Sequence, residues 1–304
     1  MQCGERKIHT EESMGLPRLT STIVITLLLL LSLMHAQNAT CTFETFTAPS
    51  GYTFSQVQGV SDDGTVVGQL VDSKTLKSVG FMRSPSGVFT EYAAPNSSVT
   101  WMNGRSGSGA NAGYYQDAKT PQNIHGFMLQ GSKLVLVNYP KAANTFLFDV
   151  NQLGDAVGSF SAGPIVTKGF LLANGTYTTI AYPSAQATYP VAISDSGAIV
   201  GSYATTVLNG FLWQNGTFIT INHKNAKYGT ALTGVNKSGV IVGNRFSADR
   251  GFGFLYENGT FKNIVYPGAN YTLGGGINNN GLISGQIVLN VAGTDTVGYT
   301  AVCK

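Results

Sequence analysis

The sequence predicts an all-β protein, specifically a six-bladed β-propeller built from four-stranded antiparallel blades. Three observations predict this fold class: a repeat of 42–45 residues, short strand-like segments within each repeat, and a missing last strand that the start of the chain can supply. A period of about 40–45 residues that holds four short strands is typical of propeller blades.

The repeat is marked by a Gly-x3-Gly pair and by a Gly-aromatic pair that follows it. The first pair recurs at Gly64/Gly68, Gly109/Gly113, Gly154/Gly158, Gly197/Gly201, Gly239/Gly243 and Gly281/Gly285. The second recurs at Gly80-Phe81, Gly126-Phe127, Gly169-Phe170, Gly210-Phe211, Gly253-Phe254 and Gly298-Tyr299. We number the repeats 1 to 6 in this order.

Each repeat reads as four strands, because its segments of Val, Ile, Phe, Tyr and Thr are short and end at Gly, Asn, Asp or Pro. Ser194-Asp195-Ser196-Gly197 is typical of the turn between the first and second strands, where Ser and Asp bond the backbone and Gly takes a positive φ. Type I′ hairpin turns between third and fourth strands are predicted at Asn174-Gly175, Asn215-Gly216 and Asn258-Gly259.

Residues 1–36 are predicted to be a secretory signal. An apolar, Leu-rich run from Ile23 to Leu33 follows Arg18, and Met34-His35-Ala36 offers a small-residue cleavage site. Residues 37–304 are then a single β-propeller domain, which we expect to be secreted or periplasmic.

The two ends of this domain complement each other. Repeat 6 stops one strand short at Lys304, and the missing fourth strand is predicted at about residues 41–49. Aligned on the repeat, Cys303 takes the place of Asn215 and Cys41 that of Gly216, so both cysteines fall on a hairpin turn. A Cys41–Cys303 disulfide would replace that turn and hold the ring closed in an oxidising compartment; the alternative is two free thiols.

The net charge and the positions of the cysteine and histidine residues argue against several kinds of partner and site. The formal net charge is only +3, and the basic residues do not cluster, which argues against nucleic acid or a membrane surface as partner. No cysteine lies at the predicted cleavage site, so we expect no lipid anchor. His125 and His223 lie in non-adjacent repeats, so neither a metal site, a cofactor site nor a Ser-His-Asp arrangement is predicted. We expect a monomer.

The repeats resemble the extracellular HAF repeat of secreted bacterial proteins. The closest matches are Ile193-Ser194-Asp195-Ser196-Gly197, Gly253-Phe254-Leu255 and Tyr266-Pro267-Gly268-Ala269, and the resemblance covers residues 41–303. It implies a secreted, β-propeller-like repeat protein, and it carries no catalytic residues that could be transferred to this chain.

Two sets of aromatic and polar residues are candidates for ligand binding. One occupies the same position after the fourth strand in four repeats: Tyr139, Tyr182, His223 and Tyr266. Such rings could stack on sugars, or they could simply end a strand and pack within the fold. The other set makes repeat 2 the most polar and aromatic, and it includes Trp101, Tyr115, Asp117 and His125.

Two charged residues interrupt the pattern of the first strands. Small residues stand five positions before the first Gly in most repeats, but Asp149 stands there in repeat 3; apolar residues stand four before it, but Arg105 stands there in repeat 2. They could form an ion pair or lie at the mouth of a central channel.

The favoured function is a non-enzymatic propeller that binds a glycan, or a cell-surface protein, through its loop face. The alternatives are a carbohydrate-active hydrolase or lyase on the same scaffold, with paired carboxylates as acid and base, or a purely structural envelope protein. Buried carboxylates with raised pKa in the channel would favour the enzyme, and an exposed aromatic patch would favour the binding protein.

Overall fold

Strands and turns make up the chain from residue 37 onward, without a helix in the part that the structure describes. This computed structural model describes residues 37–304 except 164–165, 248–249, 291 and 293–294, so the predicted signal at 1–36 lies outside the described residues. Gln37–Lys304 form one compact unit. Within the described residues, no helix could cross a membrane.

Repeats 1 to 5 each form four consecutive strands that pair antiparallel with their neighbours, and repeat 6 forms three. Repeats 1 and 2 contain β3 (Tyr52–Val60), β4 (Val66–Asp72), β5 (Ser78–Arg83), β6 (Phe89–Tyr92), β7 (Ser97–Arg105), β8 (Ala110–Asp117), β9 (Ile124–Gln130) and β10 (Lys133–Leu136). Repeats 3 and 4 contain β11 (Thr145–Val150), β12 (Ala156–Ser161), β13 (Thr167–Ala173), β14 (Thr176–Ile180), β15 (Ala187–Ile193), β16 (Ile199–Ala204), β17 (Leu208–Gln214) and β18 (Thr217–Thr220). Repeats 5 and 6 contain β19 (Gly229–Val235), β20 (Ile241–Ser247), β21 (Arg250–Glu257), β22 (Thr260–Asn263), β23 (Tyr271–Ile277), β24 (Leu282–Val288) and β25 (Thr296–Cys303).

The turns have the backbone conformations that their residues predict. The first Gly of every Gly-x3-Gly pair has a φ between +80° and +87°. Both residues of Asn174-Gly175, Asn215-Gly216 and Asn258-Gly259 have positive φ, as a type I′ turn requires.

The Gly-x3-Gly and Gly-aromatic motifs meet in the core of each repeat. Phe81, Phe127, Phe170, Phe211, Phe254 and Tyr299 have no exposed surface. In five repeats, a Cβ atom on the second Gly of the pair would lie 2.6–2.8 Å from the ring of this aromatic residue. The second Gly is therefore needed because the ring on the third strand packs directly against the second strand.

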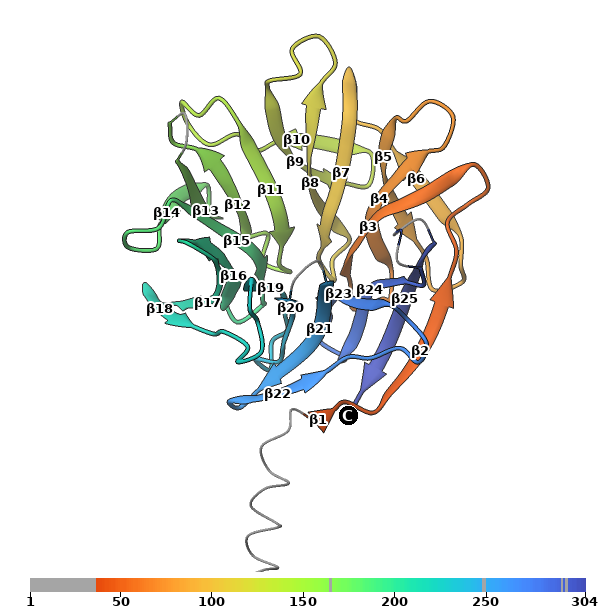
Figure 1. The fold of residues 1–304 in the computed structure, drawn as a ribbon. Coiled ribbons are helices and arrows are strands. Elements are labelled where there is room, and N and C mark those ends of the chain that lie inside the picture. Colours follow the sequence, from red (N-terminus) through yellow and green to blue (C-terminus); the bar gives the residue numbers. More distant parts are fainter. Residues whose placement is uncertain (1–36, 164–165, 248–249, 291, 293–294) are drawn as a thin grey trace, which may run out of the picture. The chain divides into compact units, whose positions relative to one another are not determined.

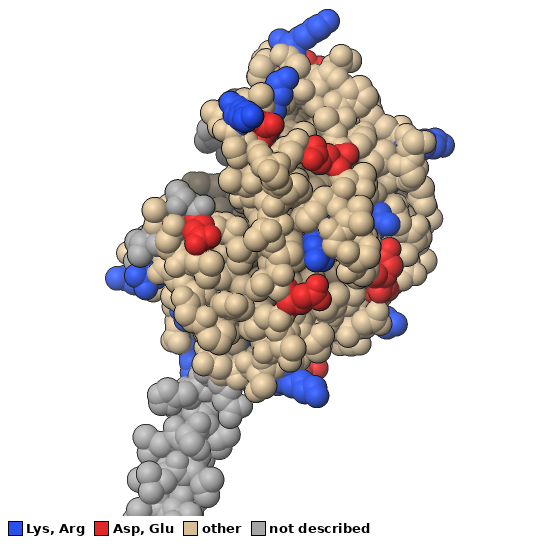
Figure 2. Space-filling view, turned by 90° about the vertical axis from the view of Figure 1, so that its right-hand side faces the viewer, with Lys and Arg blue, Asp and Glu red and all other residues tan. Residues whose placement is uncertain are grey.

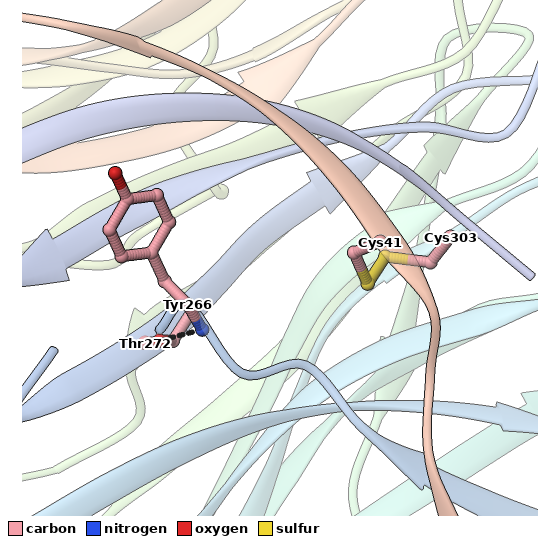
Figure 3. Close-up of a disulfide and its surroundings, with 4 residues drawn as sticks. All are labelled: Cys41, Tyr266, Thr272 and Cys303. Atoms are coloured by element: carbon pink, nitrogen blue, oxygen red, sulfur yellow. Dashed lines mark hydrogen bonds between the residues drawn. A yellow bond between two sulfur atoms is a disulfide. The ribbon is translucent and has the colours of Figure 1, made fainter. Parts of the chain in front are cut away.

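The N-terminal segment supplies two further strands, β1 (Gln37–Asn38) and β2 (Cys41–Phe46). β2 pairs antiparallel with β25 from Cys41↔Cys303 to Phe46↔Gly298, so it takes the fourth-strand position of repeat 6. The predicted disulfide is present, with Cα atoms 4.1 Å apart and a sequence separation of 262 (Figure 3). β1 pairs parallel with β22, a pairing that the sequence did not predict.

The repeats follow one another round a central region in residues 37–304 (Figure 1). Single parallel bridges connect the third strand of one repeat to the first strand of the next, for example Leu208↔Gly229. The strand pairings nevertheless fall into two sheets, of 17 and 8 strands, and the 8-stranded sheet holds β3–β10. Strand pairing alone therefore does not form one continuous ring.

Candidate functional site

The first strands of the repeats surround a cavity of about 340 Å³. Each of them has a β-bulge or register shift just before its turn, such as Leu147/Asp149 in β11 and Leu232/Gly234 in β19. The bulge residues all line the cavity, and they are Gln58, Asn103, Phe148, Val191, Thr233 and Gly275. Because the bulge interrupts the period of two, these positions could not be assigned to the cavity by counting along the strands.

Aromatic side chains of repeats 2 and 3 form one part of the cavity wall. Tyr114 and Phe148 line it, with ring centroids 6.1 Å apart in an edge-to-face arrangement. Trp101 stacks on Tyr114 at 4.7 Å, and Phe146 contacts the same ring edge-on at 5.1 Å. Three neighbouring rings therefore fix the orientation of Tyr114.

Glycine and short polar residues form much of the remaining wall. The backbones of repeats 5, 6 and 1 approach closely here: a Cβ atom on Gly234 would lie 2.9 Å from Cα of Gly276, and one on Gly276 would lie 3.2 Å from Cα of Gly59. Gln56, Gln58 and Asn103 contribute amide groups. One part of the cavity is thus aromatic, and the other presents backbone and amides.

Asp149 lines this cavity and is held by backbone N–H groups of two repeats. Its Oδ1 accepts a hydrogen bond from N of Val150 at 2.9 Å, and its Oδ2 accepts one from N of Ile193 at 3.0 Å. A Cβ atom at Gly104 would collide with Oδ1, so glycine there makes room for the carboxyl group. Burial, with a smaller contribution from the Asp195 carboxylate, raises the pKa of Asp149 to about 7, although the hydrogen bonds from the two backbone N–H groups oppose the rise.

Hydrogen bonds cross the axis where the first and second strands turn. Nδ2 of Asn279 donates to Oδ2 of Asp62 at 2.9 Å and to Oδ2 of Asp195 at 2.7 Å. Nε2 of Gln152 donates to Oδ2 of Asp62 at 3.0 Å. These four residues belong to repeats 1, 3, 4 and 6, and three of them (Asp62, Asp195 and Asn279) line the cavity, so their side chains bridge it at this end.

Arg105 also lines the cavity, but it forms its ion pair with Asp63 rather than with Asp149. The distance from Nη2 of Arg105 to Oδ2 of Asp63 is 3.6 Å, and Nη1 donates to O of Gly109 and Oδ1 of Asn111. Arg105 thus ties repeat 2 to the turn of repeat 1, and the alternative of an Arg105–Asp149 pair is wrong.

The four residues that follow a fourth strand share one backbone contact and pack separately. N of Tyr139, Tyr182 and Tyr266 donates to the Thr Oγ1 six residues later, and N of His223 donates to Thr230 (Figure 3 shows the Tyr266–Thr272 bond). Tyr139 stacks on Phe160 at 3.6 Å, Tyr182 stacks on Tyr203 at 3.5 Å, and Tyr266 contacts Phe43 edge-on. His223 is buried against Phe254 and Phe261. Each ring packs within its own part of the fold, and the four do not form one patch.

The polar residues of repeat 2 are divided between two places. Trp101 lies behind Tyr114 at the cavity, whereas Tyr115 pairs with His125 at 5.3 Å elsewhere on β8 and β9. Nδ1 of His125 lies 3.3 Å from Nδ2 of Asn138. Asp117 accepts hydrogen bonds from N of Lys119 and N of Thr120, which lower its pKa and organise the loop. Only Trp101, through Tyr114, is connected to the cavity.

Charged side chains are sparse on the molecular surface. On the face that Figure 2 shows, Lys, Arg, Asp and Glu are scattered among uncharged residues. In the described part of the chain, no group of three or more His, Cys, Asp or Glu residues is arranged to hold a metal ion.

The chain was compared with known proteins. No protein-family model matches it, and no curated protein does. Similar solved structures include a mutant of AofleA from Arthrobotrys oligospora (TM-score 0.53, 13% identity, 82% of this chain and 83% of that chain). Another is a predicted gluconolactonase, with a TM-score of 0.52 and 12% identity over 90% of this chain and 96% of that chain. A third is a mutant of the Aleuria aurantia lectin in complex with Fucα1-6GlcNAc, with a TM-score of 0.50 and 12% identity over 83% of this chain and 93% of that chain. These proteins are β-propellers, and at such low identity the likeness shows the fold alone. The chain therefore has an all-β, propeller-like fold.

Proposed function

We propose that this protein is a secreted six-bladed β-propeller that binds a glycan in its axial cavity. In this proposal the six repeats are the six blades, β2 completes the last blade, and the repeats belong to the HAF type that their motifs resemble. The predicted signal at residues 1–36 and the Cys41–Cys303 disulfide support secretion, and the protein acts as a monomer without a cofactor.

The observation that carries the proposal is the mixed wall of the cavity. Phe148 and Tyr114 offer apolar ring surfaces, and Gln56, Gln58 and Asn103 offer amide donors and acceptors. Sugars present both apolar faces and hydroxyl groups, and a cavity of about 340 Å³ is at the small end of ligand sites. The Asn279 bridge to Asp62 and Asp195 obstructs the turn end, so a ligand enters from the opposite, loop-bearing end.

Co-sedimentation of the secreted protein with a panel of insoluble plant and bacterial polysaccharides tests the proposal. Phe148→Ala should lower the bound fraction at least tenfold, because it removes a cavity wall. Tyr182→Ala is the matched control, since this ring packs on Tyr203 away from the cavity. Loss of binding in the Tyr182 variant with retention in the Phe148 variant would move the site to the loop face. No binding across the panel would favour a protein partner or a structural role.

A second candidate function is glycan cleavage, because one observation favours it. Asp149 has a pKa of about 7 and lies in the same cavity as Asp195, so it could donate a proton near neutral pH. Release of reducing ends from a bound polysaccharide, absent in Asp149→Asn, would establish this activity. Binding without release in the wild-type protein would leave the non-enzymatic function.

A further inference from the structure

A second cavity, of about 480 Å³, lies where β2 and β25 meet repeat 1. Phe46 of β2, Arg83 of β5 and Phe89 of β6 line it, and so do Thr45, Thr47 and Gly87. It shares no lining residue with the axial cavity. It therefore offers a binding site that is independent of the one proposed above.

Arg83 is the charged group of this cavity, and it is only 9% exposed. Its guanidinium carbon lies 4.3 Å from the ring centroid of Phe46, so the ring supports the guanidinium plane. Its Nε is buried and has no hydrogen-bond partner among the described residues. A guanidinium carries five N–H donors, and buried donors are nearly always paired in folded proteins. Nη1 and Nη2 likewise make no hydrogen bond to a described residue, but unlike Nε they are not buried, so they are the spare donors of Arg83 at the wall of the cavity.

Glu44 does not satisfy these donors. The only polar contact to the Arg83 guanidinium among the described residues joins Nη2 to Oε1 of Glu44 at 3.6 Å, which is too long for a hydrogen bond. The Glu44 side chain is 68% exposed and belongs to β2, an outer strand of its sheet. Because solvent screens the largely exposed Glu44 carboxylate, its attraction to Arg83 is weak, and a ligand can displace it.

We propose that this cavity binds an oxyanion carried by a sugar, namely the carboxylate of a uronic acid residue. Arginine pairs with a carboxylate through two parallel N–H···O bonds, and Nη1 and Nη2 supply that fork. Phe89 provides an apolar surface for the sugar ring, and the hydroxyl groups of Thr45 and Thr47 can bond its hydroxyls. The oxyanion site stands on Arg83 alone, whereas the sugar that carries the anion rests on the proposed glycan-binding function.

Arg245 is a matched control within the chain. Its guanidinium carbon also lies 4.3 Å from an aromatic centroid, that of Phe252, and its Nε is likewise buried without a partner. Arg245 does not line the cavity of Arg83. A variant of Arg245 therefore reports what the loss of a stacked arginine does by itself.

Isothermal titration calorimetry of the secreted protein with trigalacturonate, its fully methyl-esterified form and sodium sulfate tests the site. We expect trigalacturonate to bind at least tenfold more tightly than the neutral ester. Arg83→Gln should remove this preference, and Arg245→Gln should leave it unchanged. Glu44→Gln should tighten trigalacturonate binding several-fold, because it removes a competing carboxylate; Glu44 is exposed, so this variant tests the site even if Arg83→Gln does not fold.

Several results would overturn the inference. They are equal binding of acid and ester, no binding of either, an unaltered preference in Arg83→Gln, or weaker binding in Glu44→Gln. Sulfate that competes as strongly as trigalacturonate would overturn the assignment to a sugar acid. Failure of the axial site can be distinguished from failure of the Arg83 site. Phe148→Ala should weaken the binding of neutral polysaccharides but leave the preference for trigalacturonate over its ester intact.

Discussion

At the scale of single residues, Asp149 is the side chain most at odds with its surroundings. The first strands of repeats 1, 2, 5 and 6 have glycine at the equivalent position, and those glycines allow neighbouring backbones to touch. A carboxyl group fits in repeat 3 because Gly104 leaves space for it and because N–H groups of Val150 and Ile193 bond it. Its raised pKa is the consequence of this burial.

The raised pKa predicts how stability depends on pH. Because the folded-state pKa of about 7 lies above the ordinary value of 3.8 for an aspartate, the folded protein holds the Asp149 proton where the unfolded chain has lost it. The contribution of Asp149 to stability therefore falls as pH rises from about 4 to about 7, by a few kcal/mol in total. Thermal unfolding across this range should show that the melting temperature of the wild-type protein falls with rising pH relative to that of Asp149→Asn, because asparagine does not titrate. Parallel curves would contradict the assignment of the proton to Asp149.

The residues of the axial cavity were only partly predictable from the sequence. Arg105 and Asp149 stand out because each breaks a recurring small or apolar position. Phe148 and Asn103 do not stand out, because they lie in β-bulges, where side chains no longer alternate between the two faces of the strand. Arg83 could not be singled out, since its spare donors follow from burial against Phe46, a residue 37 positions earlier.

At the scale of elements, the turns between first and second strands connect the repeats as well as reverse the chain. The first turn residue is Ser or Asn in every repeat, and it is buried. Where it is Asn, its Nδ2 donates to the backbone carbonyl of the next repeat: Asn151 to Ser194, Asn236 to Asn278, and Asn278 to Ser61. Serine retains the turn but cannot reach across.

Because only asparagine bonds the next repeat, substituting serine for asparagine at the first turn residue, or asparagine for serine, should have opposite effects on the free energy of unfolding. Asn236→Ser should lower the free energy of unfolding by about 1 kcal/mol, because it loses the bond to O of Asn278 but keeps an acceptor for the turn. Ser194→Asn should raise it by a similar amount through a new bond to O of Asn236. Urea unfolding at constant pH measures both. Equal destabilisation by the two exchanges would mean that side-chain size, rather than the bond between repeats, decides stability.

The sequence predicted that the turn aspartates stabilise their own turns, but it did not predict their hydrogen bonds to other repeats. Ser-Asp-Ser-Gly predicts a local turn, and the positive φ of Gly197 confirms it. However, Oδ1 of Asp195 accepts a hydrogen bond from N of Gln152 in repeat 3, and Oδ2 accepts one from Asn279 in repeat 6. Those contacts depend on how the repeats are arranged in space, which no local pattern contains.

At the scale of the whole molecule, the disulfide joins the two ends of the described chain. Cys41 and Cys303 take the positions of a hairpin turn, and the alignment of repeats predicted their pairing because the turn residues are so regular in the other repeats. The parallel pairing of β1 with β22 was not predictable, since two residues carry no strand signal of their own.

Removal of the disulfide should cost stability without altering the strands. The Cys41→Ser/Cys303→Ser double variant frees a loop of 262 residues in the unfolded chain, which corresponds to a loss of about 2–5 kcal/mol. Denaturant unfolding in oxidising buffer should show this loss, and a reductant should lower the stability of the wild-type protein alone. If the reductant shifts both proteins equally, the disulfide does not form or does not contribute.

The covalent link between Cys41 and Cys303 also bears on the order in which the repeats can be connected. Their Cα atoms are 4.1 Å apart, and every other repeat closes the same place with a short turn of two or a few residues. An Asn-Gly peptide in place of the disulfide would join the present termini, and the chain could be opened instead at Asn215-Gly216. Such a circular permutant is expected to reach the same fold, because each repeat makes equivalent contacts with its neighbours. The starting point of the chain is then a matter of genetic arrangement rather than of folding.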